Sequence, residues 1–153
     1  MTTLHIDGPA AIPDHVGARL GPTEWVEVDQ ARIDQFAEAT GDHQWIHVDP
    51  ARAAQGPFGT TIAHGFLTLS LIPAFFDSAL KVRQSRMGVN YGLNRVRFMA
   101  PVPVDSRLRA RMRLLEARPI EAGGQQFTME VTIERAGADK PVCVAESIAR
   151  RYP

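Results

Sequence analysis

The sequence predicts an α+β fold in which helical segments come first and an antiparallel sheet follows. The most apolar run of the chain, residues 61–76, has the composition of a buried helix. Residues 107–115 and 126–134 alternate between polar and apolar side chains, which is the pattern of half-buried antiparallel strands. One buried helix followed by a long meander indicates an antiparallel sheet wrapped around a long central helix.

The first half of the chain contains start and stop signals for short elements. Residues 25–28 alternate in polarity and predict a short strand. Asp29 can cap a helix that follows it, and Gly41 is a suitable stop for that helix. A second short helix is expected over residues 49–55, with Asp49 as its cap and a proline at its first position.

The central helix is expected to begin at about residue 63 or 64 and to end at about residue 80. Pro73 lies inside this span, and we expect a kink there because proline removes one backbone hydrogen bond. The first 22 residues are rich in glycine and proline and predict an irregular lead-in to a single domain that spans residues 1–153.

Two further strands complete the predicted four-stranded sheet. Residues 89–102 form a long strand that is expected to bend at Gly92, and residues 141–153 form another. Gly123 and Gly124 supply the turn between the two alternating strands.

Composition limits the functional class. Lys+Arg and Asp+Glu both number 17, so the formal net charge is zero and the basic surplus of a nucleic-acid-binding domain is missing. The only cysteine, Cys143, can form no intrachain disulfide, which suits a reducing compartment. No secretory signal is recognised, and the apolar run is shorter than the roughly 20 residues of a membrane span. We therefore expect a cytoplasmic enzyme or binding domain with no membrane partner.

The segment GDHQWIHVDP, residues 41–50, permits three interpretations. The first is a metal site, because His43 and His47 are four residues apart, as in the zinc protease signature H-E-x-x-H. Glycine and Asp-Pro interrupt any continuous helix here, and Gln44 cannot act as the general base of such a protease. No metal is expected.

The second interpretation is an ordinary connection, in which Asp42 caps a turn and His47 is a buried histidine with its hydrogen bonds satisfied. The third is an acid–base pair, because a carboxylate and an imidazole aimed at one water can deprotonate it and deliver a proton to a neighbouring carbon. Gly65, at the predicted start of the central helix, could supply a backbone N–H to a developing oxyanion.

The order of motifs resembles the MaoC-like (R)-specific enoyl-CoA hydratase family, and specifically its nodulation protein N-like branch. The matching segments are FAEATGDHQWIHVDP, a Gly/Pro/Phe loop, IAHGFLTLS and NYGLNRVRFMAPVPV, within a resemblance that runs from about residue 23 to 151. The resemblance implies a hot-dog fold and a homodimer with sheets joined edge to edge. It implies no metal and no cofactor beyond the coenzyme A that is attached to the substrate.

The resemblance also implies roles for individual residues. Asp42 and His47 would hold and activate water, and the N–H of Gly65 would polarise the thioester carbonyl. Gln44 stands near the position where the commonest hydratases have Asn-Pro, and its amide could hold a loop carbonyl. Asn90 could line the acyl pocket.

The chain departs from many hydratases on the central helix as well. Where those enzymes have a serine that hydrogen-bonds the carboxylate, this chain has Pro73, and Ser70 lies one turn earlier.

The expected reaction is reversible hydration of a trans-2-enoyl-CoA to the (R)-3-hydroxyacyl-CoA. Two alternatives are kept. One is a hot-dog acyl-CoA thioesterase, which also needs an activated water, and the other is a non-catalytic subunit that binds acyl thioesters.

Overall fold

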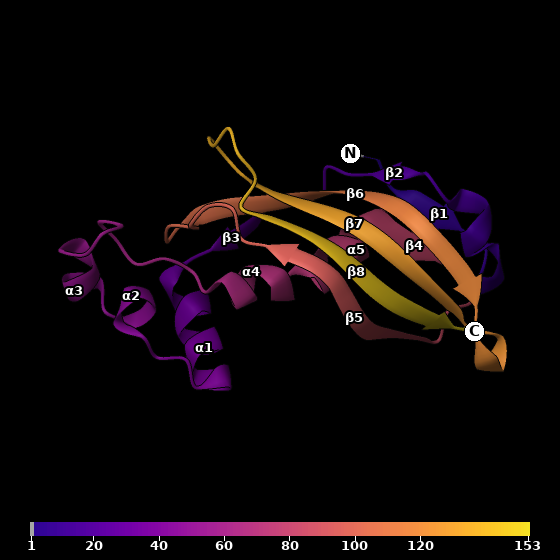
Figure 1. Ribbon diagram of the computed structural model, residues 1–153, viewed down its shortest axis with the longest axis horizontal. Helices are drawn as coiled ribbons and strands as arrows, with labels where there is room; N and C mark the ends of the chain where they lie inside the picture. The colour runs from indigo at the N-terminus through magenta and orange to yellow at the C-terminus, as the bar shows by residue number, and fades with distance from the viewer. Residues whose placement is uncertain (1) are drawn as a thin grey trace.

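The computed structural model describes residues 2–153 and consists of a long curved sheet that covers a central helical segment (Figure 1). The main sheet has six strands in the order β2-β6-β7-β8-β5, and β3 also pairs with β6. Its four long strands are β5 (Met87–Arg97), β6 (Ser106–Pro119), β7 (Gln125–Arg135) and β8 (Cys143–Tyr152). All pairs in this sheet are antiparallel. The α+β class and the antiparallel sheet are confirmed.

The inner face of the sheet and the central helices form the hydrophobic core. Every second side chain is buried over residues 106–114 of β6 and 125–133 of β7, where Thr128 is buried as well, as the alternating pattern predicts. The ring of Phe127 on β7 lies with its centroid 6.3 Å from that of Phe76 on the central segment. Cys143 is buried at the start of β8, and burial raises the pKa of its thiol to about 11. It is a core residue, as its place in a strand pattern indicates.

The central helix consists of two pieces, α4 (Gly65–Ser70) and α5 (Ile72–Ala79). The break falls at Leu71, before Pro73, so the expectation of one helix kinked at the proline is corrected. Pro73 lies in the first turn of α5. Backbone N–H groups in a first turn have no acceptor within the helix, so proline loses no hydrogen bond there. None of the helices within residues 2–153 has the length and apolarity needed to cross a membrane.

Residues 2–22 contain regular elements, so the prediction of an irregular lead-in is wrong for these described residues. They contain β1 (Leu4–Ile6), the 3₁₀ helix η1 (Pro9–His15) and β2 (Arg19–Leu20). β1 pairs in parallel with β4 (Leu80–Val82), and β2 pairs with β6. Three apolar side chains of this segment are buried in the core: Ile6, Ile12 and Leu20. Strands this short have too few residues to show a period in the sequence. Their conformation is determined by the strands that they pair with.

The short elements before the central helix follow the predicted signals. β3 (Val26–Val28) leads to α1 (Gln30–Thr40), whose first turn is capped by the Asp29 carboxylate, accepting from Arg32 N–H at 2.9 Å. After α1 come α2 (Trp45–Val48) and α3 (Pro50–Ala54), at one end of the molecule in Figure 1. α3 is capped by Asp49 and has a proline at its first position, so the prediction for residues 49–55 is confirmed.

Two turns of the sheet also agree with their glycine signals. The register of β5 against β8 shifts between Asn90 and Gly92, which is the site of the expected bend. Gly123 adopts a φ of 72°, which favours glycine, in the 3₁₀ turn that joins β6 to β7.

Candidate active site

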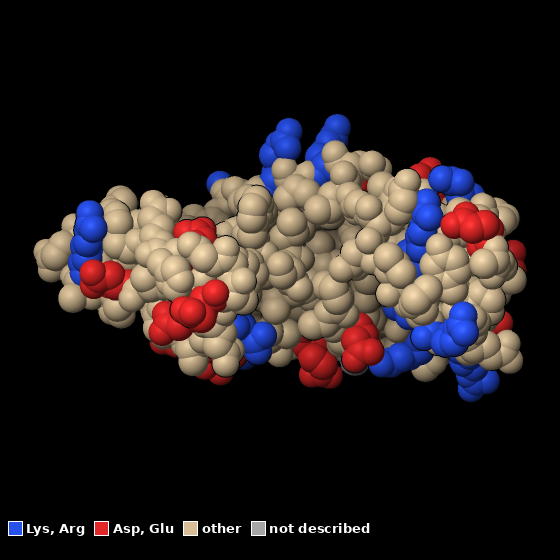
Figure 2. All heavy atoms as spheres, turned by 90° about the horizontal axis from the view of Figure 1, so that it is seen from below, with Lys and Arg blue, Asp and Glu red and all other residues tan. Residues whose placement is uncertain are grey.

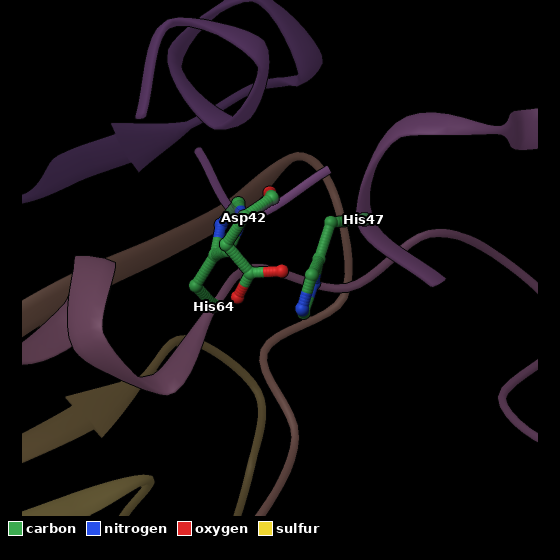
Figure 3. Close-up of side chains that lie close together, drawn as sticks. All are labelled: Asp42, His47 and His64. Atoms are coloured by element: carbon green, nitrogen blue, oxygen red, sulfur yellow. The ribbon is translucent and has the colours of Figure 1, made fainter. Parts of the chain in front are cut away.

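Asp42 and His47 come from the short connection between α1 and α2 and face a common cavity. Gly41 ends α1 in the left-handed conformation, with φ of 84°, and turns the chain toward α2. Figure 3 shows the Asp42 carboxylate directed toward the His47 ring. The Asp42 residue is exposed, whereas His47 is 6% exposed. Both line a cavity of about 440 Å³ together with Gly65, so the structure brings the three predicted residues into one place.

The His47 ring is fixed by a buried hydrogen bond. Its Nδ1 lies 2.7 Å from the main-chain oxygen of Ile62, and because a carbonyl only accepts, Nδ1 carries the proton. The Nε2 of the neutral ring therefore keeps its lone pair. Burial lowers the pKa of His47 and outweighs the bond to Ile62, which raises it; nearby His64 lowers the pKa further and Asp42 raises it. His47 is thus poised to accept a proton near neutral pH.

Gly65 is the first residue of α4, and an N–H in this position has no acceptor within its own helix. A Cβ at this residue would lie 3.0 Å from the ring of Phe98, so a larger residue would have to displace that ring. Gly65 and His47 also line a second cavity of about 330 Å³. Its other walls are mainly apolar and include Phe58, Met99 and Val142.

His64 is the site residue that sequence reasoning missed. It is 3% exposed, and its Nε2 lies 3.0 Å from the main-chain oxygen of Asp42. Its ring stacks on that of His47, with centroids 3.9 Å apart and an interplanar angle of 24°. Its place directly before Gly65 was the available signal, because it puts His64 in the wall of the same cavity.

The ligand atoms of Asp42, His47 and His64 lie within 4.8 Å of one another, which is close enough for three ligands of one metal ion. The ring geometry argues for another use. An imidazole binds a metal in the plane of its ring, and the two stacked rings have nearly parallel planes. In the observed geometry the two rings stack on each other and each makes a hydrogen bond to a main-chain oxygen.

The remaining predicted residues lie away from this cluster. Gln44 is exposed at the start of α2, where its main-chain N–H lies 3.4 Å from Asp42 Oδ1. Asn90 lines a separate cavity of about 340 Å³ with Ser70 and Pro73. Ser70 Oγ donates to the Phe66 carbonyl at 2.7 Å, which places its hydroxyl on the helix backbone.

His43, the first histidine of the zinc-like pattern, also lies outside the cluster. Its side chain is 52% exposed, and its ring nitrogen lies 3.7 Å from a carboxylate oxygen of Glu38.

The edge strand β5 and the loop that follows it expose a band of apolar side chains. Exposed large apolar residues here are Met87, Val89, Tyr91, Leu93, Phe98 and Met99. Figure 2, which views the molecule from the β5 side, shows that the centre of this face carries few charged side chains. Exposed apolar area of this kind on an edge strand is typical of an interaction surface.

A sheet wrapped around a central helix, with an Asp–His pair facing the start of that helix, defines a hot-dog protein of the hydratase type. The family model described as "MaoC like domain" matches residues 12–137. The chain belongs to this family and is a hydro-lyase.

Two relatives match nearly the whole chain. The 3-hydroxyacyl-thioester dehydratase Z of Mycobacterium tuberculosis is 53% identical over 134 residues, which cover 88% of this chain and 89% of the relative. Nodulation protein N of Rhizobium leguminosarum bv. viciae is 51% identical over 147 residues, which cover 95% and 91%. The resemblance to the nodulation protein N-like branch is confirmed.

Solved structures confirm the hot-dog fold. The (R)-hydratase from A. caviae involved in PHA biosynthesis superimposes with a TM-score of 0.71 and 23% identity, covering 90% of this chain and 96% of that one. A monoamine oxidase regulatory protein from Archaeoglobus gives a TM-score of 0.78 and 22% identity, covering 100% and 99%. At these identities the likeness concerns the fold alone.

Proposed function

We propose that the protein catalyses the reversible addition of water to a trans-2-enoyl-CoA, giving the (R)-3-hydroxyacyl-CoA. The observation that carries the proposal is the convergence of Asp42, the neutral ring of His47 and the N–H of Gly65 on one cavity. The relative named as a 3-hydroxyacyl-thioester dehydratase, which is 53% identical, supports the same chemistry.

The thioester oxygen accepts a hydrogen bond from Gly65 N–H, which draws electron density from the C2–C3 double bond and makes C3 electrophilic. Asp42 and His47 hold a water molecule between them. One of the two takes a proton from this water as the water oxygen bonds to C3. The electron pair of the former double bond then takes a proton at C2 from the Asp42–His47 pair, which thereby gives up the equivalent of the proton taken from water and returns to its starting protonation state.

The acyl chain is assigned to the apolar cavity of about 330 Å³, because that cavity shares Gly65 and His47 with the reacting groups. The cavity that Asn90 lines shares no residue with the Asp42 site. A role for Asn90 or Gln44 in substrate binding stays a prediction.

A homodimer is part of the proposal. Two β5 edges joined side by side would continue the sheet across both subunits and cover the exposed apolar band. Because Phe98 and Met99 belong to that band and also line the apolar cavity, the partner would close one side of the acyl site.

A hydration assay across trans-2-enoyl-CoA substrates of increasing chain length tests the proposal. Loss of the enoyl absorbance without release of free thiol is the expected result. Thiol release from acyl-CoA would identify a thioesterase instead, and ligand binding without turnover would identify a non-catalytic subunit.

A further inference from the structure

His64 is not a member of the proposed water-activating pair, but it contacts both Asp42 and His47. Its ring nitrogen lies 3.0 Å from the Asp42 main-chain oxygen, a contact between residues 22 apart in sequence. Its ring covers one face of His47 at 3.9 Å. The Phe36 ring, 4.9 Å away and tilted by 57°, also packs against it. At 3% exposure, His64 has little room to adopt another rotamer.

Hydrogen bonding defines the proton position on His64. The Asp42 carbonyl only accepts, so Nε2 of His64 carries the proton and donates. The other nitrogen, Nδ1, is buried and has no hydrogen-bond partner within residues 2–153. A second proton on Nδ1 would be a buried donor without an acceptor, and its charge would lie against the stacked His47 ring. The contacts therefore fit the tautomer that carries its proton on Nε2.

The loop that carries Asp42 has few other strong attachments. The Asp42 N–H lies 3.4 Å from Thr40 Oγ1, and Asp42 Oδ1 lies 3.4 Å from Gln44 N–H. Both contacts are local and longer than typical hydrogen bonds. The bond from His64 is shorter and comes from the rigid start of the central helix. It is thus suited to fix the position of the Asp42 backbone relative to His47.

We propose that His64 is a positioning residue, whose neutral ring holds the Asp42 main chain in place and keeps His47 in its stacked orientation beside it. This proposal rests on the proposed hydration reaction. Its structural content, namely the proton position on His64 and the influence of His64 on His47, can be measured without any substrate.

Two variants separate the hydrogen bond from the ring. His64→Phe keeps an aromatic ring against His47 but removes the N–H donor to Asp42. His64→Gln removes the ring and keeps an amide N–H that can reach the Asp42 carbonyl. The thermal midpoint and circular dichroism of both variants establish that they fold.

In the hydration assay, His64→Phe is expected to lower kcat about tenfold or more with little change in KM, and His64→Gln to recover most of that loss. In parallel, ¹⁵N NMR of the imidazoles is expected to show the Nε2-protonated form of His64. Because the His64 ring stacks on that of His47, loss of this ring in His64→Gln should shift the ring-proton resonances of His47, whereas His64→Phe keeps a stacked ring.

Wild-type kcat in His64→Phe, equal losses in both variants, or unchanged His47 ring resonances in His64→Gln would overturn the proposal. If the wild-type protein hydrates no enoyl-CoA, the proposed function fails, and the NMR measurements still decide whether His64 is tied to Asp42 and His47.

Discussion

His47 and His64 are fixed reciprocally, because each ring donates to a main-chain carbonyl in the segment that carries the other. His47 donates to Ile62, two residues before His64, and His64 donates to Asp42, five residues before His47. The two rings then stack at 3.9 Å. These two hydrogen bonds join the α1–α2 connection to the start of the central helix. The proposed reaction requires Asp42 and His47 to lie beside the Gly65 N–H at this place.

Removing either member of the Asp42–His47 pair should abolish most turnover and leave the fold intact. We expect Asp42→Asn and His47→Gln each to lower kcat by about 100-fold or more, because each removes one of the two groups that hold the water and transfer protons. Steady-state hydration kinetics measure the loss. His43→Gln is a matched control, since His43 is exposed and lies one residue from Asp42. Near-normal turnover in either of the first two variants would rule out the pair.

Prediction from sequence succeeded where a local pattern is also the cause of the structure. The alternation in β6 and β7 produces a half-buried sheet, and Asp29 and Asp49 each cap the helix that follows. Asp42 and His47 were found because motif order marked them. Their convergence with Gly65 depends on the packing of α1 and α2 against the central segment, which no local pattern encodes.

Other features were missed because their causes are not local. β1 forms because β4 offers a parallel neighbour 76 positions later in sequence, as the Leu4–Leu80 register shows. His64 acquires its role from a carbonyl 22 residues earlier, supplied by an irregular loop. Spacing within one element could not predict either contact, since the partner lies on another element.

Hydration activity should decrease at acidic pH as His47 becomes protonated. Burial, the largest influence, lowers the pKa of His47 from its usual value of 6.5. A neutral His47 should therefore persist below pH 6.5, and kcat/KM should decline only as the pH drops through the lowered value. An NMR titration measures the midpoint of His47, and a pH–rate profile measures the pH at which kcat/KM declines. A His47 midpoint above 6.5 would contradict the expectation.

The same lowered pKa links proton binding to stability. In the window between the folded-state pKa and 6.5, the unfolded chain binds more protons at this residue than the folded chain does. The contribution of His47 to stability therefore rises with pH through that window and is lost as the pH falls. Denaturant unfolding of wild type and His47→Gln at pH values across the window should show a smaller pH dependence in the variant.

A methyl group at Gly65 should impair the reaction more than the fold. The added Cβ would lie 3.0 Å from the Phe98 ring and would crowd the approach to the Gly65 N–H. We expect Gly65→Ala to lower kcat/KM by roughly tenfold, which is less than the loss of an oxyanion donor, because the N–H itself remains. Adding Phe98→Leu to Gly65→Ala should restore part of the activity. Wild-type kinetics in Gly65→Ala would argue against close approach of substrate at this N–H.

A charge on the β5 edge should separate the proposed dimer. Val89 and Leu93 are 40% and 45% exposed on β5, and a lysine at either position would place an ammonium group inside the joined sheets. Val89→Lys and Leu93→Lys are each expected to convert the sedimenting species from dimer to monomer. Val16→Lys is the matched control, because Val16 is 48% exposed but follows η1, away from that edge. A dimer that survives both β5 substitutions would show that the subunits associate through another face.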